Sequence, residues 1–326
     1  MRNPGIDLVR VAGVLAIVAG HIWLSEPAHR FLFAWHVPVF FFLSGYLWKR
    51  RPIGFKAGTE IGARSKTLLR PYVLWLVVLL VPYLVVLGAT GELTPGRLLG
   101  PLWGGAYATR PFTTFWFVFV LFAAAVLWQA VTRLPAWGQS AVVVGALALS
   151  IVAGPALAIT PLALGTALPA LVFVAAGAWA RRVEPRLAGR AWLAAALLLF
   201  SCLAVGFGAV APLDIKSGDW GTPVLSVVVA VAISWAMVIL AQSLCSGMSP
   251  RADSVITGFA LCGFTIVLGH PAVLWTLAGA DWPRPLVFAL AVALPTVVAL
   301  VGRRTPLSGW VTGAPRVASQ PVSTVA

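Results

Sequence analysis

Long apolar runs divide this chain, and their length limits its possible folds more than any other feature. Of its 326 residues, 60% are hydrophobic and 10% are charged, whereas soluble domains carry about 25% charged residues. A helix needs about 20 apolar residues to cross a bilayer. The sequence therefore predicts an all-α, polytopic membrane helix bundle of about ten transmembrane helices. The predicted spans are 8–24, 31–48, 72–88, 112–132, 140–156, 161–180, 191–210, 223–246, 254–278 and 285–302.

Basic residues between the spans predict the orientation of the bundle. With a cytoplasmic N-terminus, seventeen of the 23 lysines and arginines fall in cytoplasmic segments, five fall on the opposite side, and Arg10 lies within a span. Cytoplasmic loops carry an excess of Lys and Arg, so both termini are predicted to be cytoplasmic. The predicted location is the cytoplasmic (plasma) membrane, with the lipid bilayer as a partner. The net charge of +14 does not indicate nucleic-acid binding, because the basic residues are not gathered in a soluble module with interleaved aromatics.

The predicted domain organisation is one membrane domain, 1–304, followed by a disordered cytoplasmic tail, 305–326, rich in Ser, Thr, Pro and Val. The first apolar run resembles a signal peptide, but it is long and no small-residue cleavage site follows it, which favours a retained span. The short connection between the fifth and sixth spans contains Gly154-Pro155 and Thr160-Pro161. These two pairs allow a broken or re-entrant segment at 154–161.

Cysteines in this chain are predicted to pack within the bundle. They are odd in number, lie inside apolar runs and lack the spacing of a zinc site. They are Cys202, Cys245 and Cys262.

Ionisable residues within the first span are the first candidates for chemistry, because such residues are costly to place in a bilayer. Arg10 and His21 are eleven residues apart, so they share a helix face about 16 Å apart along the axis. Asp7 lies close to the same stripe. Arg10 would then lie near the cytoplasmic surface and His21 near the outer one. Alternatively, Arg10 extends to the inner interface or pairs with Asp7, and His21 is an interior histidine with satisfied hydrogen bonds.

Two further histidines are predicted to reach the depth of His21. His36 opens the second span, which returns through the membrane, and His270 lies in the outer half of the ninth. Trp116 begins the fourth span at the same level, where its default role is an interfacial anchor. Three histidines could bind a metal, but no local spacing such as His-x-x-x-His supports this, and no metal site is predicted. His29, in the outer loop, is given no specific role.

A basic segment after the second span is chiefly a topology signal, and its charge density could also neutralise a phosphorylated donor. The candidate donor-binding residues there are Arg64, Lys66 and Arg70, accompanied by Lys49, Arg50, Arg51 and Lys56. A second basic group could act in the same way: Arg181, Arg182, Arg186 and Arg190.

Taken together, these motifs resemble the acyltransferase-3 family of integral-membrane O-acyltransferases, particularly its fucose 4-O-acetylase-like branch. The order and spacing of the motifs match from residue 6 to about 275. The matching pieces are Ile6-Asp7-Leu8-Val9-Arg10 with His21, His36-Val37-Pro38-Val39-Phe40-Phe41-Phe42-Leu43-Ser44-Gly45-Tyr46, Thr67-Leu68-Leu69-Arg70-Pro71-Tyr72 with Trp75, Phe115-Trp116-Phe117, and Gly269-His270-Pro271.

This resemblance implies a ten-helix bundle that moves an acyl group, usually acetyl, from cytoplasmic acyl-CoA to a hydroxyl of a sugar or glycolipid, commonly on the outer side. It implies acetyl-CoA as a donor substrate and no permanently bound cofactor. His21 would be the catalytic histidine, with Asp7 in the catalytic group and Arg10 binding the donor. The chain departs from the family in the spacing of the arginines before Pro71, and in lacking the tyrosine often found shortly before His270.

An alcohol is a poor nucleophile, so acyl transfer to it needs a base within hydrogen-bond reach, and His21 suits that role. The oxyanion formed needs a donor, for which His36, His270 and Trp116 are candidates that the sequence cannot separate. A transient acyl-histidine is a less favoured variant. The alternative function is a membrane transporter of a small solute or acylated glycolipid, with the same buried groups guiding an anion or relaying protons. A third alternative is a non-enzymatic membrane scaffold, which would have no need of ionisable residues within the membrane.

Overall fold

The computed structural model describes residues 2–49, 57–184, 189 and 191–317, and the regular elements in these ranges are helices. The first half of the chain forms α1 (Pro4–Gly20), α2 (Glu26–Phe33), α3 (Pro38–Tyr46), α4 (Ala57–Arg64), the π-helical turn η1 (Ser65–Leu69), α5 (Arg70–Ala89), α6 (Pro95–Trp103), the 3-10 turn η2 (Gly105–Tyr107), α7 (Phe115–Val131) and α8 (Ala136–Ala158). The second half forms the 3-10 turn η3 (Pro161–Thr166), α9 (Ala167–Val183), α10 (Ala191–Gly206), α11 (Leu225–Cys245), α12 (Pro250–Ala260), α13 (Gly263–Thr276), α14 (Arg284–Gly302) and α15 (Ser308–Val311).

The long apolar runs of the sequence form helices of membrane-spanning length. Five are long and apolar enough to cross a bilayer alone, and the bent pair α12 and α13 makes a sixth if it counts as one span. The five are Ile61–Ala89, Ala136–Ala158, Pro161–Val183, Leu225–Cys245 and Arg284–Gly302. The all-α class is thus confirmed, while the count of ten spans and the cytoplasmic position of the termini stay predictions.

Several predicted spans are shorter or broken. The predicted span 31–48 divides into α2 and α3, and Pro38, which has no N–H to donate, starts α3 at a position where none is needed. The predicted span 254–278 bends by 49° between α12 and α13. A break also precedes α9, where Leu162 and Ala163 have positive φ angles of 56° and 54°. The breaks at residues 34–37 and 261–262 place backbone turns inside the helical body.

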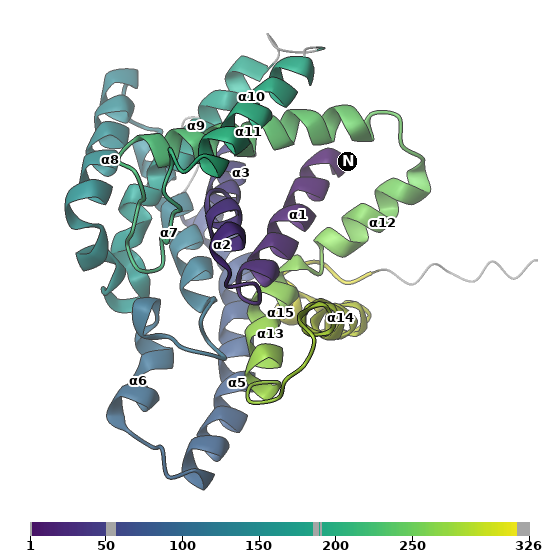
Figure 1. The fold of residues 1–326 in the computed structure, drawn as a ribbon. Coiled ribbons are helices and arrows are strands. Elements are labelled where there is room, and N and C mark those ends of the chain that lie inside the picture. The colour runs from purple at the N-terminus through teal and green to yellow at the C-terminus, as the bar shows by residue number, and fades with distance from the viewer. Residues whose placement is uncertain (1, 50–56, 185–188, 190, 318–326) are drawn as a thin grey trace, which may run out of the picture.

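Helix α1 lies at the centre of the fold, between α11, α12 and α13 (Figure 1). Its first turn approaches α11 so closely that a Cβ at Gly5 would stand 2.6 Å from the Cα of Gln242. The other end of α1 faces α2 and the part of α13 that carries His270. Both ends of the helix face that carries Arg10 and His21 are therefore surrounded by other helices.

Two glycines allow α3 and α9 to cross in direct backbone contact. A Cβ at Gly45 would lie 1.8 Å from the carbonyl oxygen of Val174, and one at Gly177 would lie 1.9 Å from that of Phe42. Small residues permit such close approach of membrane helices. This crossing fixes α3, and with it the turn that carries His36.

The segment 305–317 is ordered, which corrects the prediction of a disordered tail from residue 305. It forms α15, and the Val311 carbonyl accepts hydrogen bonds from Trp75 Nε1 and Thr265 Oγ1, both at 3.0 Å. Small and polar composition suggested disorder, but these tertiary hydrogen bonds hold the segment against α5 and α13. Residues 318–326 lie outside the described part of the chain.

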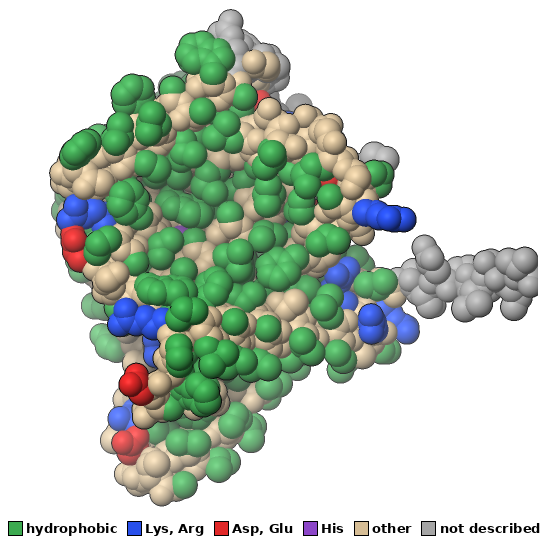
Figure 2. Space-filling view, turned by 45° about the vertical axis from the view of Figure 1, so that its right-hand side comes forward, with side chains coloured by type: hydrophobic (Ala, Val, Ile, Leu, Met, Phe, Trp, Pro, Cys, Tyr) green, Lys and Arg blue, Asp and Glu red, His purple; other side chains and the backbone are tan. Residues whose placement is uncertain are grey.

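Hydrophobic side chains cover most of the face seen in Figure 2, with Lys and Arg in a few groups near its edges. Large apolar residues on the long helices are strongly exposed, such as Val152 at 84% and Val85 at 66%. A water-facing surface rarely exposes contiguous apolar area of this kind. The surface therefore suits lipid.

Candidate active site

Three histidines from separate elements meet at one end of α1. His21 caps the C-terminus of α1, His36 lies in the turn before α3, and His270 is on α13. His270 Nε2 is 3.3 Å from His21 Nδ1, and the two ring centroids are 5.1 Å apart. His36 lines the same cavity as His21. The predicted convergence of the three side chains is thus present, while their chemical roles stay predictions.

Backbone carbonyls fix which nitrogen of each ring carries a proton. Each Nδ1 faces the carbonyl oxygen four residues earlier: His21 with Ile17 at 2.9 Å, His36 with Leu32 at 2.7 Å and His270 with Ile266 at 2.9 Å. A carbonyl only accepts, so each Nδ1 donates, and in a neutral ring Nε2 then has the lone pair. Nε2 of His270 can therefore accept from the same His21 Nδ1–H, which is then shared between His270 and the Ile17 carbonyl. The His21 ring is thus held through Nδ1, which leaves its Nε2 to act as an acceptor.

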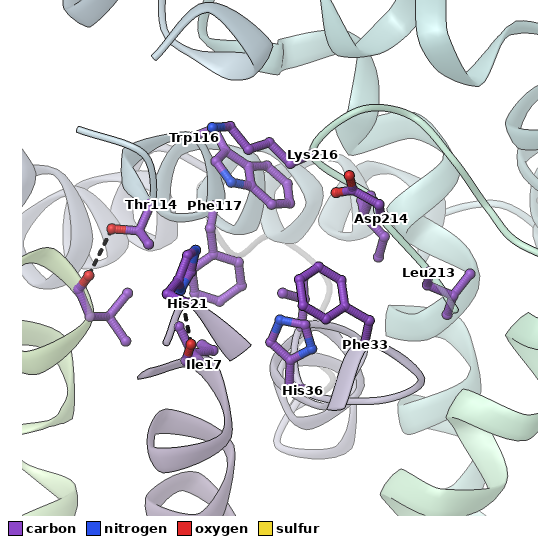
Figure 3. A pocket seen from close by; sticks show the side chains of 13 residues that line it. Ile17, His21, Phe33, His36, Thr114, Trp116, Phe117, Leu213, Asp214 and Lys216 are labelled. Carbon is purple, nitrogen blue, oxygen red and sulfur yellow. Dashed lines mark hydrogen bonds between the residues drawn. The ribbon is translucent and has the colours of Figure 1, made fainter. Parts of the chain in front are cut away.

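The cavity at these rings, called here the histidine cavity, has a volume of about 180 Å³. Figure 3 shows Trp116 and Lys216 on one side of it and His21 and His36 on the other. Thr114 Oγ1 donates to the Val267 carbonyl at 2.7 Å, which fixes the start of α7 against α13. Trp116 is only 6% exposed and lines the cavity, so it is a wall residue rather than only an interfacial anchor.

Lys216 was not predicted as a site residue, yet it lines the histidine cavity together with Asp214. It comes from the segment between α10 and α11, and its Nζ donates to the Ala108 carbonyl and to Thr113 Oγ1, both at 2.8 Å. Burial lowers the pKa of Lys216 to about 8, and Asp214 partly offsets that effect. One lysine in a loop carries no sequence signal beyond topology, so only tertiary structure could reveal it.

Arg110 is a second unforeseen cation beside the histidines. Its NH2 donates to the His21 carbonyl at 3.0 Å, and burial lowers the pKa of its guanidinium. This bond fixes the turn in which α1 ends. The charged groups Arg110, Asp214 and Lys216 near the His21 ring thus come from two connecting segments, 104–114 and 207–224.

A separate cavity of about 380 Å³ lies at the other end of α1 and is called here the arginine groove. Arg2 and Arg10 line it, along with Val14 on the next turn of α1. The groove is closed on other sides by Thr67 and Leu68 of η1 and by residues 312–315. Arg10 therefore occupies a cavity, as its predicted role requires, and Arg2 is an addition that the sequence did not single out.

Asp7 lies with these arginines and not with the histidines. It is 1% exposed and accepts from Arg2 Nε and NH2, both at 3.0 Å, from Arg10 NH1 at 2.8 Å and from Thr257 Oγ1 at 3.1 Å. Fourteen residues of helix separate it from His21, or about 21 Å. The predicted catalytic role of Asp7 stays a prediction, and the structure places its carboxylate on Arg2 and Arg10 at the end of α1 far from His21.

The predicted donor-binding residues of the basic segment flank the arginine groove without forming its wall. Arg64 lies over the Trp48 ring at 5.2 Å, Arg70 lies over the Trp310 ring at 5.5 Å, and Lys66 is exposed. Arg181 lies over the Tyr46 ring and pairs with Glu184 at 3.0 Å. Lys49 and Arg182 are exposed, and the other predicted basic residues lie outside the described part of the chain: Arg50, Arg51, Lys56, Arg186 and Arg190.

Metal ligation finds no support in the arrangement of acidic, cysteine and histidine side chains. Within the described ranges, no three such residues are grouped closely enough to hold an ion. The cysteines in these ranges are unpaired, and two of the three are buried, in line with a packing role.

One face of α1 thus carries, in order, Arg10 and Val14 in the arginine groove and Ile17 and His21 in the histidine cavity. A family model for an acyltransferase domain matches residues 3–304, which contain both cavities. The chain belongs to the acyltransferase-3 family. Comparison with curated proteins and with solved structures finds no match.

Membership of the acyltransferase-3 family supports a membrane acyltransferase activity for this chain. The match covers nearly the whole chain, so the resemblance predicted from the motifs is confirmed at the level of the family. The fucose 4-O-acetylase-like branch stays a prediction.

Proposed function

We propose that this protein transfers an acyl group, acetyl in the simplest case, from cytoplasmic acyl-CoA to a hydroxyl of an extracytoplasmic or membrane-bound sugar or glycolipid. The observation that carries the proposal is the arrangement of α1. One helix face presents a guanidinium to the arginine groove and an imidazole with a free Nε2 to the histidine cavity. The proposed location is the cytoplasmic membrane.

The donor would place its phosphates at the arginine groove. Arg2 and Arg10 both line this groove, and the buried carboxylate of Asp7 orients both guanidinium groups. Guanidinium groups bind phosphate oxygens with charge-assisted hydrogen bonds. The extended thioester arm would then follow α1 for about 16 Å towards His21.

His21 would act as the general base. Its Nε2 takes the proton of the acceptor hydroxyl as that oxygen forms a bond to the thioester carbonyl carbon. The C–S bond then breaks, and the departing thiolate receives the proton from His21 to give free CoA thiol. His270, at 0% exposure and bonded through Nε2 to His21, would position the base rather than touch the substrate.

Trp116 and Lys216 are the stronger candidates to stabilise the oxyanion. His36 faces the cavity with an Nε2 that accepts, because its Nδ1 is used by the Leu32 carbonyl, so it suits the acceptor hydroxyl better than an oxyanion. The indole N–H of Trp116 and the ammonium of Lys216 are donors on residues that line the cavity. An oxyanion needs such donors in a site sheltered from water.

Purified protein in lipid nanodiscs, given labelled acetyl-CoA and an extract of membrane lipids and glycans, tests this function. Wild type should release CoA and move label to the extract. His21→Ala should lower transfer by about 10²- to 10⁴-fold, the usual contribution of a general base. Arg10→Ala should chiefly raise the KM for acetyl-CoA.

The matched control is His29→Ala, because His29 stacks on Phe33 at 4.1 Å and does not line the cavity. Unchanged transfer by folded His21→Ala protein would remove His21 as the base. Solute uptake without CoA release by wild type would favour the transporter. Comparing envelope glycans and glycolipids by mass, with and without the gene, would identify the acceptor.

A further inference from the structure

The arginine groove and the histidine cavity meet at one wall. Two residues line both spaces, Phe117 of α7 and Val267 of α13. On α1 the boundary falls between Val14, which lines the groove, and Ile17, which lines the cavity. The route that a thioester arm would follow along α1 therefore passes two apolar residues that border both spaces.

Neighbouring rings hold the larger of these side chains in place. Phe117 is 7% exposed, and its ring meets Phe40 at 5.5 Å and Phe41 at 5.6 Å between centroids, both edge to face. Figure 3 shows the Phe117 ring next to His21. Val267 is 5% exposed, and its carbonyl accepts from Thr114. Contacts with neighbouring residues thus hold both Phe117 and Val267 in place.

We propose that Phe117 is the specificity-determining residue for the acyl group, and that its ring forms the partition across which the acyl end of the donor reaches His21. This inference rests on the proposed function. The donor occupies the groove, and only its acyl carbon and the atoms beyond must fit between the Phe117 ring and the His21 ring. A short acyl group fits there by a small displacement of the ring, whereas each added methylene competes with the phenyl group for the same space.

The same partition keeps water in the histidine cavity from the thioester until the acceptor is in place. Without it, His21 Nε2 can take a proton from water instead of from an alcohol. The water oxygen then bonds to the carbonyl carbon, the C–S bond breaks, and the products are the free acid and CoA thiol. Loss of the ring should therefore change acyl preference and also release CoA without an acceptor.

The experiment compares acetyl-CoA with butyryl-CoA and hexanoyl-CoA, using wild type, Phe117→Ala, Phe117→Leu and Val267→Ala in nanodiscs. Removing the ring should raise the ratio of butyryl to acetyl transfer by roughly tenfold or more, since a methylene in an apolar pocket changes selectivity by about that factor. The two milder variants should shift the ratio in the same direction. Phe117→Ala should also release CoA without acceptor, and adding His21→Ala should abolish this release.

Phe119→Ala is the matched control, because Phe119 is on the same helix, packs towards Tyr72 and lines neither space. It should keep the wild-type ratio. An unchanged ratio in folded Phe117→Leu and Val267→Ala, with transfer intact, would overturn the inference and leave the proposed function standing. Failure of wild type to bind or use any acyl-CoA would instead overturn the proposed function, and this inference with it.

Discussion

Lys216 loses its proton at a pH at which most lysines keep theirs. Its pKa lies at about 8, lowered mainly by burial and raised again in part by Asp214. Two of its three donors go to Ala108 O and Thr113 Oγ1, and the side chain lines the cavity that contains His21. A cation at this place is protonated below pH 8 and neutral above it, within the range in which an enzyme can be assayed.

If Lys216 stabilises the oxyanion, acyl transfer should fall as the pH rises through about 8, because the ammonium is present below this pH and lost above it. Lys216→Met should lower kcat at pH 7 by about 10²-fold and remove this basic limb. Lys216→Arg should keep activity to higher pH, since a guanidinium stays charged. A pH profile of kcat for the three proteins measures this, and an unchanged basic limb in Lys216→Met would contradict it.

At the scale of elements, the crossing of α3 and α9 positions the site. The backbones touch through Gly45 and Gly177, and Tyr46 at the end of α3 accepts from Gln242 Nε2 of α11 at 3.1 Å and from Arg181 NH1 of α9 at 3.3 Å. These contacts lie at the opposite end of α3 from His36. They hold the helix along its length, so the turn that presents His36 has little freedom to shift.

Gly177→Ala should destabilise the protein, because its Cβ would lie 1.9 Å from the Phe42 carbonyl and the two helices would have to separate. We expect a loss of about 1–3 kcal/mol, as for other overpacked sites, seen as a lower unfolding temperature in detergent. The control is Gly145→Ala in α8, where nothing lies within 4 Å of the added Cβ. Equal unfolding temperatures for the two variants would show that the crossing is not tight.

At the scale of the whole molecule, the two cavities lie towards opposite ends of α1, and the proposed function gives one to the donor and the other to the acceptor. The predicted orientation places Arg10 at the cytoplasmic face and His21 towards the outer face. Acyl-CoA is charged and does not cross a bilayer unaided. The side of the membrane on which added acyl-CoA is used therefore reports the orientation of the protein.

Because the basic loops predict a cytoplasmic donor site, inside-out membrane vesicles, with the cytoplasmic face exposed, should use added acetyl-CoA, whereas sealed right-side-out vesicles should not. The measurement is CoA release, with detergent-opened vesicles as the control for total activity. Equal use by both sealed preparations would contradict the predicted orientation and the route along α1.

Composition and spacing sufficed to predict part of this protein. An apolar chain in lipid must satisfy its backbone hydrogen bonds within helices, so the all-α class followed from hydropathy. Arg10 and His21 share a face because helical periodicity is a local property, and the motif order identified the family. These inferences needed no knowledge of which helices are neighbours.

Tertiary structure decided the rest. The bond from His270 to His21, the arrival of Lys216 and Arg110, and the wall formed by Phe117 and Val267 join residues far apart in the chain. The bonds of Asp7 to Arg2 and Thr257 could not be read from hydropathy either. Contacts between distant segments depend on packing and side-chain shape, which local periodicity does not encode.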